Sequence, residues 1–286
     1  MVEVISRRIR NKMNRCRGFR KKGVNTMMVL GGMAAWNTPL LIILVCISVW
    51  YCFWAKKHPD IRFSQFYWFH AGIGLFYLLI GSPLYVLSHL TFITHMLQMS
   101  ILYFFVPPLL LLGIPGRLGQ KWKKRNISSF SALIIFSILF FLYHLPQVLP
   151  FLYKNLVIHT SYILCLFALS FLMWFPVITP GSSLKRYSWW SSILLMPACL
   201  LLILNGLLGG QENSPLFSQL MLKLCIPSDQ SAALLPFQMN TKADQILGGL
   251  LMLALHKFSL MVAIRLGSQR MCLKNLKLKP SLHKME

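Results

Sequence analysis

The sequence predicts an all-α polytopic membrane helix bundle with about seven transmembrane helices. Hydrophobic residues make up 56% of the 286-residue chain and charged residues only 12%, whereas a soluble domain carries about a quarter charged residues. The apolar residues come in blocks of about 18, the length that crosses a hydrocarbon core of roughly 30 Å. Because each backbone N–H and C=O must be paired inside lipid, these blocks should be helices.

Seven blocks have this character, and the fourth is the shortest. In chain order they are Pro39–Trp54, Phe63–Ile80, Val86–Leu111, Phe130–Tyr143, Leu156–Phe175, Trp189–Leu208 and Ile246–Ile264. The third should kink or end at Pro107-Pro108, because proline lacks the N–H that continues a helix. Gly81-Ser82-Pro83 predicts a tight turn before the third block. Gly248-Gly249 predicts a close approach between helices in the seventh.

These spans predict three parts of the chain and no separate soluble domain. The parts are a basic N-terminal segment over residues 1–35, a seven-span transmembrane domain over residues 36–266 and a basic cytoplasmic tail over residues 267–286. The longest loop, residues 209–245, has room for a small cap outside the membrane.

The first 26 residues disagree with the rest of the charge pattern, since they hold nine Lys and Arg. We expect translation to begin at Met27 or Met28, because Lys22-Gly23-Val24 can be encoded by a bacterial ribosome-binding sequence. Two alternatives are a genuine basic tail that stays inside the cell and a cleaved signal peptide.

The net charge of +23 does not indicate nucleic-acid binding, because Lys and Arg lie in the tails and between the hydrophobic spans. The loops after the first, third and fifth spans and the C-terminal tail are basic, whereas the other connecting loops hold only Lys154, Lys223 and Lys242. Positive loops stay in the cytoplasm, so we expect a cytoplasmic C-terminus and an outer N-terminus. The seven cysteines are scattered without a CxxC pair, which favours neither a disulfide framework nor a zinc site.

The ionisable residues within the spans are nearly all histidines. They are His70, His89, His95, His144, His159 and His256, with Lys257 beside the last. No acidic residue lies at the centre of a span, which argues against a carboxylate-based proton or sodium pathway. A retinal Schiff base on Lys257 is disfavoured because the counter-ion carboxylate is missing.

Four histidines should meet in the outer half of the membrane. The predicted topology brings together His89, His95, His144 and His159, and Met96 and Met99 share a helix face of about 120° with the first two. Imidazole and thioether ligands suit copper, whereas Mg²⁺ and Ca²⁺ prefer oxygen. The alternatives are haem ligation by two of these histidines and simple hydrogen bonding between helices.

Several motifs follow one another in a recognisable order. They are Gly81-Ser82-Pro83-Leu84, Ser88-His89, His95-Met96-Leu97-Gln98-Met99, Pro107-Pro108 through Gly113-Ile114-Pro115, His144-Leu145-Pro146, His159, Trp174-Phe175-Pro176-Val177 with Pro180, and Ala243-Asp244-Gln245-Ile246-Leu247-Gly248-Gly249. This order resembles the polytopic CtaG-type cytochrome c oxidase assembly factors of Gram-positive bacteria. The chain departs from the family at Met99, where many relatives carry a second histidine, and at His256-Lys257, where relatives tend to carry Gln-Glu.

The resemblance implies a plasma-membrane protein that is needed to form active cytochrome c oxidase, with a proposed role in copper handling. Its proposed copper ligands correspond to His89, His95, His144 and His159. We therefore expect a non-enzymatic protein that binds Cu(I) at an outward-facing site, with Met96 and Met99 as further ligands, and that assists copper insertion into oxidase subunits. The expected partners are these subunits and the lipid bilayer.

Two other classes of protein remain open. A metal or small-molecule transporter would need polar residues that continue to the inner side, where only His70 and His256 are candidates. A metal-free scaffold for oxidase subunits would tolerate replacement of the histidines. A haem-binding redox enzyme is a more distant third.

Overall fold

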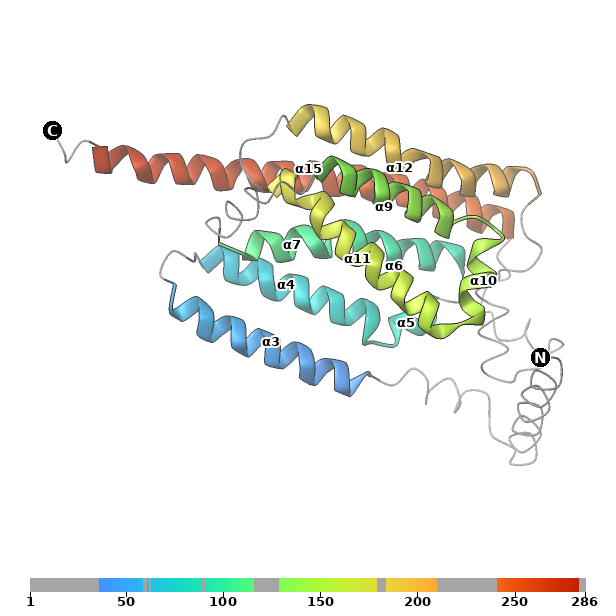
Figure 1. Cartoon of the computed structure of the whole chain (residues 1–286), viewed down its shortest axis with the longest axis horizontal. Helices are drawn as coiled ribbons and strands as arrows, with labels where there is room; N and C mark the ends of the chain where they lie inside the picture. The colour runs from blue at the N-terminus through green and yellow to red at the C-terminus, as the bar shows by residue number, and fades with distance from the viewer. Residues whose placement is uncertain are drawn as a thin grey trace.

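The computed structural model describes residues 36–58, 61, 63–88, 91–115, 129–178, 184–209 and 241–282, and across them every regular element is a helix (Figure 1). Six of these helical segments are long and apolar enough to cross a membrane, and a shorter apolar helix over Phe130–Tyr143 corresponds to the fourth predicted span. The predicted multi-pass helical bundle is therefore confirmed. The elements are α3 (Thr38–Lys56), α4 (Phe63–Ile80), α5 (Leu84–Leu87), α6 (Phe92–Phe104), α7 (Val106–Gly113), α9 (Ser129–Tyr143), α10 (Val148–Lys154), α11 (Leu156–Ile178), α12 (Leu184–Leu207) and α15 (Thr241–Leu282).

The third span, formed by α6 and α7, lies at the centre of the bundle. In its most apolar 18-residue stretch 72% of the residues are buried, against 11% in the corresponding stretch of α3. Helix α6 packs on α15, α7 packs on α4, and α11 contacts both halves. Helix α12 covers α15 and α9, while α3 packs on α4 at the edge of the bundle (Figure 1).

The third span begins later than predicted, at Phe92 rather than Val86. Helix α5 ends at Leu87, and Thr91 has an extended backbone with φ −133° and ψ 158°. The Thr91 hydroxyl accepts a hydrogen bond from the backbone N–H of Thr94 at 3.2 Å, which is a typical N-cap. The hydrophobic pattern runs across this break, so hydropathy alone could not locate it.

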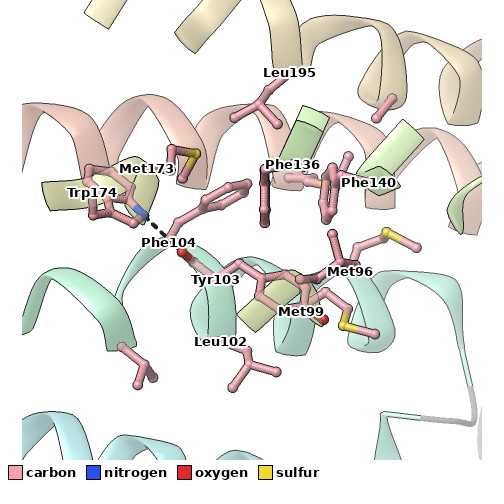
Figure 2. Packing of buried hydrophobic residues seen from close by; sticks show 14 of the residues in the cluster. Met96, Met99, Leu102, Tyr103, Phe104, Phe136, Phe140, Met173, Trp174 and Leu195 are labelled. Carbon is pink, nitrogen blue, oxygen red and sulfur yellow. Dashed lines mark hydrogen bonds between the residues drawn. The ribbon is translucent and has the colours of Figure 1, made fainter. Parts of the chain in front are cut away.

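The predicted kink at the proline pair is confirmed, since α6 ends at Phe104 and α7 begins at Val106. Pro107 has no N–H to donate to the carbonyl of Tyr103, four residues earlier. The indole Nε1–H of Trp174 in α11 donates to this carbonyl instead, at 2.9 Å (Figure 2). A neighbouring helix thus supplies the hydrogen bond that the proline removes, as a lipid environment requires.

The core beside this kink is aromatic. Phe136 and Phe140 of α9 stack with ring centroids 5.4 Å apart, and Tyr103 meets Phe136 edge to face at 5.8 Å. Phe104 also packs on this pair (Figure 2). These contacts join α6 to α9 next to the predicted metal-binding histidines.

The seventh predicted span, Ile246–Ile264, lies inside the longer helix α15. This helix begins at Thr241 and continues to Leu282, so part of the predicted basic tail is helical and extends beyond the other helices (Figure 1). The predicted close approach at the glycine pair is confirmed: a Cβ on Gly249 would lie 2.9 Å from the carbonyl oxygen of Cys199 in α12.

Candidate functional site

Three of the four predicted histidine ligands lie at the same end of the helix bundle (Figure 1). His95 is in the first turn of α6, His144 directly follows α9, and His159 is in the first turn of α11. Their side chains are at most 9% exposed. His89 lies outside the described residues.

Tyr143, the last residue of α9, connects two of these histidines. Its hydroxyl oxygen lies 3.3 Å from Nε2 of His95 and 3.5 Å from Nε2 of His159. The tyrosine side chain is itself only 1% exposed. Both imidazole rings therefore direct Nε2 at one phenol oxygen inside the bundle.

His144 is held differently. Its Nδ1 lies 2.6 Å from the carbonyl oxygen of Phe140, and because a carbonyl only accepts, Nδ1 must carry the hydrogen. The neutral ring then has its lone pair on Nε2. This nitrogen is buried and has no hydrogen-bond partner within the described part of the chain. A ring whose second nitrogen is fixed by a carbonyl is typical of metal-binding histidines.

The two predicted methionine ligands are buried in the core, at 2% exposure for Met96 and 5% for Met99 (Figure 2). Met96 faces α15, since its Cγ lies 3.2 Å from where a Cβ on Gly248 would sit. His95 faces Tyr143 of α9 instead. Met99 lies one turn after His95, on the same side of α6. Of the two sulfurs, the one in Met99 is therefore better placed to join the histidines.

Two other histidines serve contacts between helices. His256 of α15 pairs with the Ser191 hydroxyl of α12 at 3.3 Å. His70 of α4 contacts the Cys52 thiol of α3 at 3.7 Å, and its Nδ1 bonds the carbonyl of Phe66. These contacts match the helix–helix role that is common for polar side chains in membranes.

A buried carboxylate holds the start of α6. The oxygens of Asp244, in the first turn of α15, accept hydrogen bonds from the backbone N–H groups of Phe92 at 2.6 Å and Ile93 at 3.0 Å. A carboxylate at a helix N-terminus also interacts favourably with the helix dipole. Asp244 therefore fixes the turn that carries His95.

The atoms that could bind a metal at this end of the bundle are imidazole nitrogens and thioether sulfurs. Imidazole nitrogens with a nearby thioether fit copper better than they fit hard cations. No group of three or more His, Cys, Asp and Glu side chains in the described ranges is arranged to hold a metal ion. In this conformation the phenol of Tyr143 lies between two of the rings.

Sequence reasoning gave no role in this site to two of its residues, Tyr143 and Asp244, although Asp244 belongs to one of the motifs named above. Tyr143 ends a predicted span, where tyrosine is common for reasons of membrane anchoring. Asp244 precedes the predicted start of the last span, and its target is 151 and 152 residues earlier. The only feature of the local sequence that could have pointed to Tyr143 as part of the site was its position next to His144.

One comparison with known proteins gives a match. A family model described as cytochrome c oxidase caa3 assembly factor (Caa3_CtaG) matches residues 46–270, a range that contains every residue of the candidate site. No curated protein and no solved structure matches significantly.

Proposed function

The chain belongs to the cytochrome c oxidase caa3 assembly factor family, and from that premise we propose that it holds Cu(I) for oxidase subunits without catalysing a reaction. The family and the membrane-spanning helices agree with a multi-pass membrane protein of the respiratory system. The copper role rests on the histidines at one end of the bundle.

His144 is the observation that carries the proposal. A buried polar atom left without a partner costs about 1–3 kcal/mol, and the Nε2 of His144 has none among the described residues. Its Nδ1–H is at the same time fixed on a carbonyl. A metal ion bound at Nε2 would use this lone pair and compensate the cost.

The remaining proposed ligands are the other predicted histidines and methionines. His95 and His159 present Nε2 atoms to a common point, and Met99 supplies a thioether one turn from His95. His89 precedes α6 in the sequence and completes the proposed set, with Met96 as a second sulfur. All the ligands except the thioethers are imidazoles, which bind either oxidation state of copper, while sulfur favours Cu(I).

The proposed orientation places this end of the bundle outward. Basic loops stay in the cytoplasm, and Lys56 and Lys57 end α3 at the opposite end of the bundle from α5 (Figure 1). The copper centres of the oxidase lie toward the outer face, so an outer site could pass copper to the subunits without moving it across the membrane.

The test is a competition titration of the purified protein in detergent against a colorimetric Cu(I) chelator. We expect about one tightly held Cu(I) in the wild type and at least a tenfold weaker affinity in His144→Ala, since even indirect support of a metal ligand is worth about 10–100-fold. His256→Ala is the matched control, because this histidine is equally buried but pairs with Ser191.

A cellular arm separates the copper role from a scaffold. Cells that lack the protein are complemented with wild type or His144→Ala, and oxidase activity and oxidase copper content are measured. Loss of both with His144→Ala supports copper delivery. Full oxidase activity with His144→Ala, together with no specific Cu(I) binding by the purified wild type, refutes copper delivery. The metal-free scaffold then remains as the function.

A further inference from the structure

The geometry points to Tyr143 as a gate for the metal-free site: its hydroxyl holds His95 and His159 apart from copper and withdraws when Cu(I) binds both rings. This inference rests on the proposed copper function and adds a positioning residue to it. The phenol oxygen lies within 3.5 Å of both Nε2 atoms, and a metal shared by the two rings would have to approach the same two atoms.

A count of hydrogens gives the two rings different roles in the metal-free state when Tyr143 is hydrogen-bonded to both of them. A tyrosine hydroxyl has one hydrogen to donate, and its oxygen accepts through lone pairs. It can therefore donate to the Nε2 of one imidazole only. In this arrangement the other imidazole donates an Nε2–H to the phenol oxygen. One of His95 and His159 then has no lone pair on Nε2 and cannot bind a metal there.

Copper binding by both rings requires a balanced rearrangement. The proton on Nε2 of the donating ring moves to Nδ1 of the same ring, so that both rings stay neutral and both Nε2 lone pairs become free. The Tyr143 O–H bond remains intact, and the contacts of its hydroxyl to the two rings break. Cu(I) enters and leaves as the same ion, with no oxidant or reductant.

The position of Tyr143 at the end of α9 suits such a movement. After this residue the backbone turns, with the N–H of His144 bonded to the carbonyl of Phe141 at 3.0 Å. The tyrosine ring has two stacked neighbours, Tyr162 with its centroid at 6.0 Å and an interplanar angle of 26°, and His95 at 6.1 Å and 25°. A shift of the side chain along these rings leaves the backbone hydrogen bonds of the α9 interior unbroken.

The gate would serve release of the metal. Two hydrogen bonds stabilise the empty site and are recovered each time copper leaves, so they lower the affinity for Cu(I) and favour its transfer. A carrier that must give up its cargo benefits from a stable empty state.

The experiment compares Tyr143→Phe with Tyr162→Phe in the purified protein. Tyr162 is the matched control, because its hydroxyl donates to the carbonyl of Leu139 at 2.6 Å. We expect Tyr143→Phe to bind Cu(I) about tenfold more tightly, as the loss of one or two neutral hydrogen bonds in the empty state predicts, and to transfer it to a chelator correspondingly more slowly. Weaker binding would make the phenol a ligand, and unchanged binding would make it a bystander; either result overturns the gate.

A metal-free readout keeps this inference separate from the copper function. Nitrogen NMR of ¹⁵N-histidine-labelled protein, assigned with His95→Gln and His159→Gln, reports which ring nitrogen carries hydrogen. We expect one protonated and one unprotonated Nε2 for this pair in the wild type, and a changed pattern in Tyr143→Phe alone. Identical spectra for wild type and Tyr143→Phe refute the gate even where the wild type binds copper. Absence of Cu(I) binding by the wild type refutes the proposed function instead.

Discussion

Replacement of Asp244 should loosen the start of α6 and the histidine that it carries. The carboxylate accepts two hydrogen bonds from backbone N–H groups, at 2.6 Å and 3.0 Å, and its residue is 4% exposed. In Asp244→Ala both N–H groups lose their partner in a place that water hardly reaches. Hydrogen bonds to a charged group contribute about 1.5–3 kcal/mol each, and relief from burying the carboxylate offsets part of the loss. We expect a net destabilisation of about 3 kcal/mol.

The assay is hydrogen exchange of the peptide that contains Phe92 and Ile93, followed by mass spectrometry in detergent. A loss of about 3 kcal/mol corresponds to roughly a hundredfold faster exchange of these amides, since 1.4 kcal/mol is a factor of ten. The exchange rate in Asp244→Asn should lie between those of the wild type and Asp244→Ala, because an amide side chain keeps one acceptor oxygen. Leu247→Ala is the control, as Leu247 lies on the same helix and is 46% exposed. Equal exchange in Asp244→Ala and Leu247→Ala would refute the reasoning.

Two further predictions concern α15. Gly249→Ala should lower the stability by about 1–3 kcal/mol, because the new Cβ would meet the Cys199 carbonyl at 2.9 Å. Gly74→Ala is the control and should not lower it, since nothing lies within 4 Å of its Cβ. Equal thermal stability of the two variants in detergent would contradict this prediction. His256→Leu should lower the free energy of unfolding by about 0.6 kcal/mol, because the hydrogen bond to Ser191 is lost. The affinity for Cu(I) in the titration should stay unchanged. A copper defect in this variant would extend the proposed site to α15.

The helices could be predicted from the sequence because membrane insertion is decided locally. Each span must bury its own backbone bonds and expose apolar side chains to lipid, so length and hydropathy located α4 and α9 almost residue for residue. The same reasoning misplaced the start of α6. There Thr91 supplies a local N-cap that hydropathy does not register, and Asp244 accepts hydrogen bonds from a distant helix, which leaves no mark in the local pattern.

The histidine cluster could be predicted in outline and not in detail. Topology alone assigns His95, His144 and His159 to one side of the membrane, because alternate spans run in opposite directions. It does not say which ring nitrogens face each other. The placement of Tyr143 between two rings depends on how α9 is rotated about its axis, and the packing of Phe136 and Phe140 against α6 sets that rotation.

The indole of Trp174 that replaces the missing amide of Pro107 has a consequence for the order in which these two residues can be replaced. A carbonyl oxygen has two lone pairs, so Tyr103 could accept the indole while residue 107 still had its own N–H. The reverse order would have left a bare carbonyl at membrane depth, at a cost of several kcal/mol. In this chain, replacing the tryptophan while the proline stays therefore carries a penalty, whereas replacing the proline while the tryptophan stays leaves the carbonyl paired.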